Sequence, residues 1–197
     1  MQSLTIESQK ISIIKKLREV LFMEIPVLET ERLILRPLTV DDAEAVYEWV
    51  SDERVTKYMP YQTYTSTDDV RKWLMNLQSE NETNNFGFVF KENNLLIGSG
   101  DIGYSNEKSS WDFGYNIRYD YWNRGLATEA TKCMMKFAYD NFGARDFSAN
   151  HAVDNPSSGR VMEKLGLMFQ HFGEYSKFDG SKTFKAKFYN VHLDVIS

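Results

Sequence analysis

The stretch YWNRGLATEA, residues 121–130, places a glycine beside an arginine where a run of helix-forming residues begins. Backbone N–H groups in the first turn of a helix have no partner within the helix and carry partial positive charge. They can therefore bind a pyrophosphate, and Gly125 has no Cβ that would obstruct its approach. Taken alone, however, the stretch favours an ordinary strand-to-helix turn. Evidence for a phosphate site has to come from other parts of the sequence.

A second glycine pattern lies at residues 98–103, where GSGDIG matches the G-x-G-x-x-G fingerprint of dinucleotide-binding proteins. That fingerprint requires a helix directly after the glycines, because the N-terminus of the helix binds the pyrophosphate. Here the chain continues as YSNEKSSW, a turn that leads into another strand. The pattern therefore argues against a nicotinamide-dependent oxidoreductase. It predicts glycines inside a strand, at a bulge or where another group approaches closely.

The elements that must position residues 121–130 are predicted by hydrophobic periodicity and by cap residues. Thr39 with Asp42, and Ser66 with Asp69, have capping-box spacing and predict the starts of two helices. Three alternating stretches separated by short turns predict an antiparallel meander; they are residues 85–92, 95–104 and 109–118. The full order is helix, strand, two helices, three strands, helix, strand, helix and two strands. This order predicts a mixed α/β domain.

Composition limits the class of protein. The chain has 197 residues and a formal net charge of −5, which is typical of one globular domain and lacks the basic excess of a nucleic-acid-binding protein. Cys133 is the single cysteine, so no intrachain disulfide can form and the cytoplasm is the expected location. Because no apolar run of about 18 residues and no metal-ligand spacing are present, we expect neither a membrane span nor a metal cofactor.

Residues 1–25 differ from the rest of the chain. Apolar side chains recur there at helical spacing with basic residues between them, and Pro26 ends the pattern. We expect one extra helix in residues 1–25, packed on its own domain or across a homodimer, followed by a single domain over residues 26–197. A membrane-surface helix is the alternative, but Glu7, Glu19 and Glu24 dilute its basic side.

Several short motifs occur in the order typical of one family. Residues 122–127, WNRGLA, resemble the Q/R-x-x-G-x-G/A acyl-CoA motif of the GNAT N-acetyltransferases, with the initial tryptophan of the RimJ/RimL branch. Residues 112–115, DFGY, are similar to the E-I-G-Y of that branch. Residues 155–166 resemble its N-x-x-S…LEKLGF, and residues 28–43 resemble its usual opening. The resemblance covers about residues 27–193.

The resemblance implies a GNAT-type fold, in which helices flank a central, mostly antiparallel sheet whose strands splay apart. It implies acetyl-CoA as cosubstrate, with the pantetheine arm between the splayed strands and the pyrophosphate at the motif turn. The cofactor-binding residues implied in this way are Ile117, Arg118, Trp122, Asn123, Arg124, Gly125, Leu126, Ala127, Thr128, Asn155 and Ser158.

The reaction implied is direct attack of a primary amine on acetyl-CoA in a ternary complex. Asp112 stands at the position of the family's glutamate and is the expected base, directly or through a water; Asp101 on the neighbouring strand is the alternative. Many family members protonate the leaving thiolate with a tyrosine, but Met162 stands at that position here. Ser158 or a water is then the expected proton donor, with Tyr115 as another choice.

The acceptor amine stays open at this stage. A protein N-terminus, a polyamine, an aminoglycoside-like antibiotic and an amino-acid derivative all agree with the resemblance. In this family the choice depends on the helices at residues 39–78 and the loop at residues 173–183, which no motif covers. The alternative function is a catalytically weak CoA-binding sensor or scaffold, which Met162 favours and the intact phosphate motif opposes.

Overall fold

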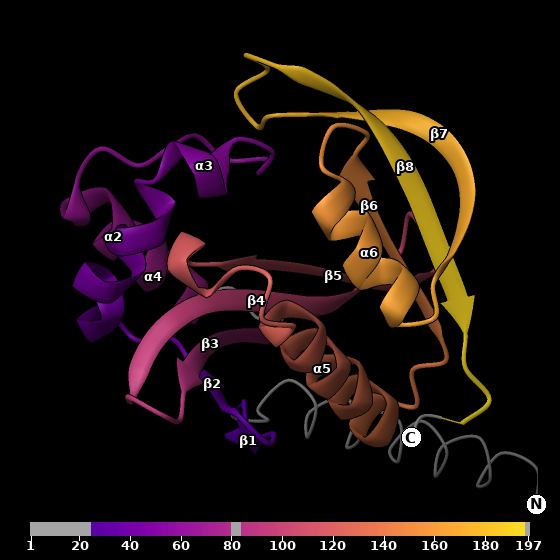
Figure 1. Ribbon diagram of the computed structural model, residues 1–197, viewed down its shortest axis with the longest axis horizontal. Helices are drawn as coiled ribbons and strands as arrows, with labels where there is room; N and C mark the ends of the chain where they lie inside the picture. The colour runs from indigo at the N-terminus through magenta and orange to yellow at the C-terminus, as the bar shows by residue number, and fades with distance from the viewer. Residues whose placement is uncertain (1–24, 80–83, 196–197) are drawn as a thin grey trace, which may run out of the picture.

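The computed structural model describes residues 25–79 and 84–195. In chain order the strands (β), helices (α) and short 3-10 helices (η) are β1 (Leu28–Glu29), β2 (Leu33–Pro37), η1 (Val40–Asp42), α2 (Ala43–Val50), α3 (Glu53–Thr56), α4 (Thr67–Ser79), β3 (Asn84–Phe90), β4 (Leu95–Ser105), β5 (Ser110–Ile117), η2 (Tyr119–Tyr121), α5 (Leu126–Phe142), β6 (Asp146–Ala152), α6 (Pro156–Lys164), β7 (Met168–Ser176) and β8 (Thr183–His192). The described strands form one eight-stranded sheet in the order β1-β2-β3-β4-β5-β6-β8-β7 (Figure 1).

The sheet is antiparallel except where β5 meets β6. Strands β3, β4 and β5 form the predicted meander. In contrast, β5 and β6 are parallel and paired only at Trp111 with Phe147 and at Asp112 with Ser148. Beyond these pairs the strands diverge, and Figure 1 shows β6 turning away from β5 with α6 beside it. The expected mostly antiparallel, splayed sheet is therefore confirmed.

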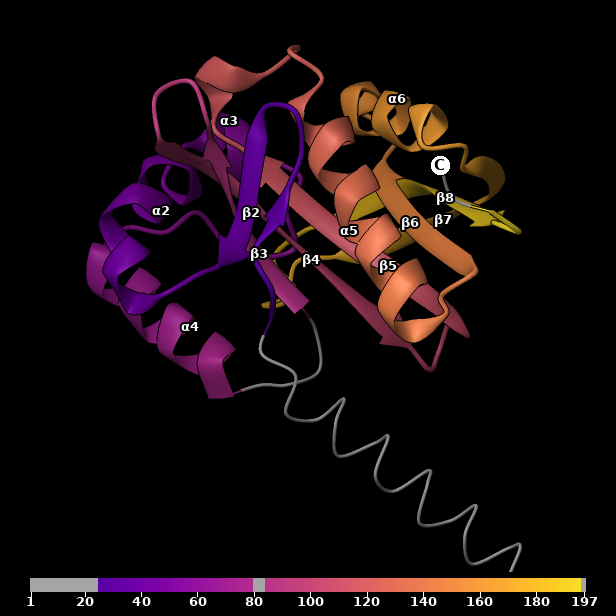
Figure 2. The same cartoon turned by 90° about the horizontal axis from the view of Figure 1, so that it is seen from below.

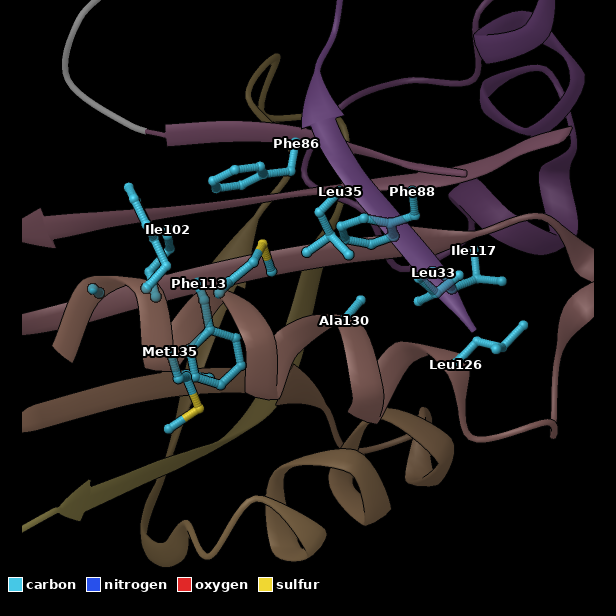
Figure 3. Close-up of a cluster of buried hydrophobic side chains, with 14 of the residues drawn as sticks. Leu33, Leu35, Phe86, Phe88, Ile102, Phe113, Ile117, Leu126, Ala130 and Met135 are labelled. Carbon is cyan, nitrogen blue, oxygen red and sulfur yellow. The ribbon is translucent and has the colours of Figure 1, made fainter. Parts of the chain in front are cut away.

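Helices cover both faces of the sheet (Figure 2). On one face α5 packs against the first hydrophobic cluster, in which Figure 3 shows Leu126 of α5 opposite Leu33 and Phe88 of the strands. On the other face α2 and α4 pack against a second cluster that contains Trp49 and Val89. Phe88 and Val89 are neighbours in β3 but belong to opposite clusters, because successive side chains of a strand point to opposite faces. Each large side chain buried in this way stabilises the fold by about 1.5–3 kcal/mol.

Both predicted helix starts are present. The amide of Thr39 donates to the carboxylate of Asp42 at 2.8 Å, and the Oγ of Ser66 accepts from the amide of Asp69 at 3.2 Å. The first of these begins η1, which continues into α2. Sequence periodicity missed α3 because four residues are too short to show a helical repeat; its N-cap is Asp52.

The glycines at residues 98–103 lie inside β4, as predicted. A Cβ on Gly98 would lie 2.3 Å from the carbonyl oxygen of Asn116, so backbone approaches backbone closely there. The register of β3 against β4 also shifts between Phe88 and Val89, opposite this glycine. A close approach and a bulge together explain the pattern without a dinucleotide site.

Two expectations concern features of the whole chain. Among residues 25–79 and 84–195, no helix has the length and apolar character needed to cross a bilayer. The same residues contain no cluster of three or more His, Cys, Asp or Glu side chains that could hold a metal ion. The extra helix expected at residues 1–25 lies outside the described residues, apart from Ile25.

Candidate active site

A cavity of about 960 Å³ opens where β5 and β6 diverge. Its walls are β5, the turn before α5, β6, α6, the α3 region and the tip of the β7–β8 hairpin. Because the facing edges of β5 and β6 share no ladder beyond Asp112, their backbone groups can bind an extended ligand. The predicted site residues that line this cavity are Ile117, Trp122, Asn123, Gly125, Leu126, Ala127, Thr128, Asn155 and Ser158.

The turn before α5 has the conformation of an anion seat. Asn123 and Gly125 both adopt left-handed backbone conformations, with φ angles of 60° and 77°. Successive amides in such a turn point into one concave space, and α5 begins directly afterwards with its own unpaired amides. Trp122 fixes the start of the turn, since its Nε1 donates to the carbonyl of Ile117 at 2.6 Å. These residues therefore fit a pyrophosphate.

Two of the residues implied as cofactor contacts, Arg118 and Arg124, have groups that already form hydrogen bonds within the protein. The amide of Arg118 donates to the carbonyl of Ile97 at 2.7 Å, so it is already used within the sheet. Because successive amides of a strand point in opposite directions, the amide of Ile117 faces the opened edge instead. The side chain of Arg124 does not line the cavity; its guanidinium donates to the carbonyl of Asp120 at 3.1 Å.

An ion pair beneath the phosphate turn was not predicted from the sequence. Arg32, between β1 and β2, contacts the carboxylate of Glu129 in the first turn of α5, with Nε and Nη2 at 2.7 and 2.6 Å. Its Nη1 also donates to the carbonyl of Arg124, at 2.9 Å, between the two left-handed residues. Arg32 and Glu129 are 97 positions apart, so no local pattern could have paired them.

The ion pair with Arg32 neutralises the charge of Glu129, which would otherwise repel a pyrophosphate at the turn. Burial alone would raise the pKa of Glu129, but hydrogen bonds from Thr30 and Arg32 outweigh it and hold the pKa below its usual range. Glu129 is therefore ionised at neutral pH. Without Arg32, an uncompensated carboxylate would lie one helical turn from the phosphate seat and repel a pyrophosphate.

We therefore expect Arg32→Gln to weaken CoA binding by about tenfold, or about 1.4 kcal/mol. Glu129→Gln should have a smaller effect, because it leaves no negative charge behind. The double variant should bind more tightly than Arg32→Gln alone, and calorimetry on all four proteins gives the coupling, expected at about 0.5–3 kcal/mol. If the loss of CoA affinity in the double variant equalled the sum of the losses in the two single variants, this role for the pair would be contradicted.

Two hydroxyl groups meet on the side of the cavity next to α6. The Oη of Tyr115, from β5, lies 2.9 Å from the Oγ of Ser158. Burial raises the pKa of Tyr115 to about 12, so this phenol stays protonated. Asn155 caps α6, because its Oδ1 accepts from the amide of Ser158 at 3.5 Å, which leaves its amide group to donate elsewhere. Met162 is buried against the same cavity.

The two carboxylates considered as bases lie on the same face of the sheet. Neither of them lines the cavity itself. Asp112 is located where β5 is still paired with β6, and it is ion-paired with Lys108. Asp101 is paired with Gly114, two residues further along β5, in the opened part. Its Oδ1 lies 2.9 Å from the position that a Cβ on Gly114 would take, and Gly114 lines the cavity. This geometry weighs against Asp112 and favours Asp101.

The surroundings of Asp101 suit a base. Enclosure raises the pKa of its carboxyl to about 6, and the nearby charge of Asp112 adds to the rise. Such a group is ionised at neutral pH and still accepts a proton readily. Asn116, on the same face of β5, lines the cavity and donates to the Oη of Tyr61 at 3.3 Å, which connects this region to the segment after α3.

The far wall of the cavity was also missed by motif analysis. It is formed by residues 54–60 and by Tyr175, Ser176 and Phe178 of the hairpin tip. Residues 58–61, YMPY, combine aromatics with a proline, which was the available sequence signal. That signal marks a turn, but it does not identify the hairpin that packs on the turn from more than 110 residues away. The contact between them is a hydrogen bond from Tyr175 Oη to the carbonyl of Tyr58 at 2.6 Å.

Comparisons with known proteins agree with this arrangement. A sequence model of the family described as acetyltransferase (GNAT) domain matches residues 32–168. The chain is 27% identical over 159 residues to an uncharacterized N-acetyltransferase, p20, from Bacillus licheniformis, covering 79% of this chain and 88% of p20. It is similar to the crystal structure of a GNAT-family acetyltransferase from Bacillus anthracis, with a TM-score of 0.75, 25% identity, and coverage of 85% and 98% of the two chains.

The fold is also shared with RimL, a ribosomal L7/L12 α-N-protein acetyltransferase solved in complex with coenzyme A. The TM-score is 0.70 at 17% identity, and the match covers 86% of this chain and 98% of RimL. The family match spans well over half of the chain and includes the phosphate turn, β5 and α6. The chain therefore belongs to the GNAT acetyltransferases, in the RimJ/RimL-like group.

Proposed function

We propose that this N-acetyltransferase moves the acetyl group of acetyl-CoA to a primary amine by direct attack in a ternary complex. Acetyl-CoA is the donor typical of GNAT enzymes. The observation that carries the proposal is one cavity bordered both by the phosphate turn and by a separate wall at residues 54–60 and the hairpin tip. A donor at the turn and the opened strands leaves that wall for an acceptor. Two substrates can then react without a covalent enzyme intermediate.

The first proton transfer is assigned to Asp101. As the amine nitrogen bonds to the acetyl carbon, it has to lose a proton, and the carbon–sulfur bond of the thioester breaks. Asp101 lies behind Gly114, which lines the opened region, and accepts that proton through a water. An α-amine, with a pKa near ~7.7–8.0, is partly neutral at pH 7 and needs less assistance than a lysine-type amine near ~10.4.

The second proton transfer is assigned to Ser158. The departing thiolate, with a thiol pKa near ~8.5, takes a proton from a water held at Ser158, or from the Ser158 hydroxyl as that hydroxyl regains a proton from solvent water. Tyr115 is a positioning residue, because its protonated Oη lies 2.9 Å from Ser158 Oγ and restricts the rotation of that hydroxyl. This pair occupies the role for which many relatives use a tyrosine at the position of Met162.

The direct test is the release of free thiol from acetyl-CoA in the presence of amines, followed at neutral pH. We expect amine-dependent thiol release with one N-acetylated product per thiol, and intersecting initial-rate lines when both substrates are varied. Tight CoA binding without thiol release for any amine would favour the sensor or scaffold function instead. Parallel initial-rate lines would indicate an acetyl-enzyme and contradict direct attack.

A further inference from the structure

The wall of the cavity opposite the phosphate turn is a preformed, aromatic chamber. It is made by residues 54–60, in and after α3, and by the tip of the β7–β8 hairpin, and its lining includes Tyr58, Tyr175 and the largely exposed Phe178. The two segments are joined by direct hydrogen bonds, from Tyr175 Oη to the carbonyl of Tyr58 at 2.6 Å and from the amide of Phe178 to the carbonyl of Pro60 at 2.8 Å. Figure 1 shows the hairpin curving over the molecule toward α3.

A buried lysine holds this chamber together. The side chain of Lys177, in the hairpin, donates from Nζ to the backbone carbonyls of Thr56, Met59 and Tyr61 at 3.4, 3.2 and 2.6 Å. Three carbonyl acceptors match the three donors of an ammonium, whereas burial lowers the pKa of Lys177 below its usual range. Among the described residues, no carboxylate lies within 4 Å of this ammonium, since Lys177 forms none of the ion pairs in that part of the chain. The Lys177 amine therefore lies behind the chamber wall, where the charge of Asp179 favours its ammonium form and that of Lys182 opposes it.

Most of the charged side chains that line the cavity are cations. Its charged lining residues are Arg54, Lys57, Arg160, Lys164 and a single carboxylate, Asp154. Of the four cations, Arg54 belongs to the chamber wall and is neutralised by Asp52, with Nη2 to Oδ2 at 2.6 Å. The Nζ of Lys57 lies 5.0 Å from the centre of the Tyr58 ring, so this lysine already forms a cation–π contact with one face of the ring.

From these observations we infer that the acceptor is a primary amine on an apolar or aromatic body that carries no second positive charge. This rests on the proposed acetyl transfer to an amine. The reacting amine needs one carboxylate, and Asp101 supplies it behind Gly114. A second ammonium would enter a chamber of aromatic rings whose own wall, residues 54–60 and the hairpin tip, contributes no carboxylate to the cavity lining, with Lys57 on that wall and Lys177 behind it. Burying a charge without a partner is strongly unfavourable, so a polyamine is disfavoured.

The experiment compares two amines of nearly equal length, heptylamine and hexamethylenediamine, which differ by a terminal methyl group against an ammonium. Phenethylamine and spermidine extend the series. We expect kcat/KM for heptylamine to exceed that for the diamine by about tenfold or more, with phenethylamine also preferred over spermidine. Equal values, or a preference for the diamine or spermidine, would overturn the inference.

A charge variant tests whether the chamber causes the preference. Lys57→Glu places a carboxylate on the wall and should reduce the ratio of heptylamine to diamine by about tenfold. Lys132→Glu makes the same change of net charge on the exposed side of α5, outside the cavity lining, and should leave the ratio unchanged. An unchanged ratio in Lys57→Glu would contradict the electrostatic cause. Absence of acetylation with every amine is a different result, because it would refute the proposed function itself.

Discussion

Asp101→Asn is expected to lower kcat by about 10²–10⁴, the range lost when a general base is removed. The amide keeps the shape of the side chain but cannot accept the proton of the amine. Affinity for CoA should barely change, because Asp101 does not line the cavity that contains the phosphate turn. Steady-state kinetics with one good acceptor, together with calorimetric titration of CoA, separates these two quantities.

The pH dependence gives this prediction its sharpest form. With the pKa of Asp101 at about 6, kcat/KM of the native enzyme should rise as pH increases through about 6. Asp101→Asn should lack that inflection, and its rate should instead rise with the fraction of neutral amine. The gap between the two enzymes should therefore shrink at high pH. Parallel profiles would remove Asp101 as the base.

Asp112→Asn is the matched control. Asp112 lies on the same face, and its charge adds to the raised pKa of Asp101. If Asp101 is the base, Asp112→Asn should leave most of the activity and move the inflection to lower pH, because a repelling charge is gone. If Asp112 were the base, as the sequence motif implies, its replacement would cause the large loss and Asp101→Asn would not.

Stability supplies an independent readout of Asp101. A carboxyl whose pKa is raised on folding binds its proton more tightly in the folded state, so its contribution to stability falls as pH rises from 3.8 through about 6. At about 1.4 kcal/mol per pKa unit, ionised Asp101 lowers the free energy of unfolding by up to about 3 kcal/mol above pH 6. Asp101→Asn should therefore be more stable than the native protein at pH 8 while being less active. A merely structural aspartate would show a loss of stability instead.

Gly125→Val is expected to weaken acetyl-CoA binding by at least about tenfold. A Cβ on Gly125 would lie 3.6 Å from Nη2 of Arg32, so the branched side chain would press on the arginine that supports the phosphate turn. Each charge-assisted hydrogen bond to the pyrophosphate that is lost as a result removes about 1.5–3 kcal/mol. Valine is also strained at the φ of 77° that Gly125 adopts. The measurement is calorimetric affinity for acetyl-CoA in the folded variant.

Gly143→Val separates the two causes. Gly143 ends α5 with a φ of 70°, nearly the same backbone conformation as Gly125 at the start of that helix. It does not line the cavity, and a Cβ there would meet nothing within 4 Å. Both variants should lose similar stability through backbone strain, but only Gly125→Val should lose affinity. Equal affinity in both variants would place the pyrophosphate elsewhere.

The sequence predicted the elements whose signals are local. Thr39 and Ser66 mark helix starts through contacts with residues three positions on, and Gly125 marks a turn through its own backbone freedom. The parts of the site that depend on distant contacts were missed. Arg32 meets Glu129 across 97 positions, and Lys177 bonds to carbonyls near residue 60 that carry no side-chain signal at all. Family resemblance implied a phosphate site at a turn whose backbone conformation fits one, but it could not reveal that Asp112 would be ion-paired with Lys108.

Because the junction between β5 and β6 is narrow, a cosubstrate bound there would connect the two halves of the sheet. The sheet is continuous across this junction through two residue pairs only, at Trp111 with Phe147 and at Asp112 with Ser148. A pantetheine arm in the gap would replace the missing ladder, so the two halves of the sheet would cooperate more strongly when it is bound. At a donor concentration 100 times its Kd, binding adds about 2.7 kcal/mol to the free energy of unfolding. The amount of folded protein in a cell would then depend on its acetyl-CoA pool, which links the lifetime of the enzyme to the supply of its own donor.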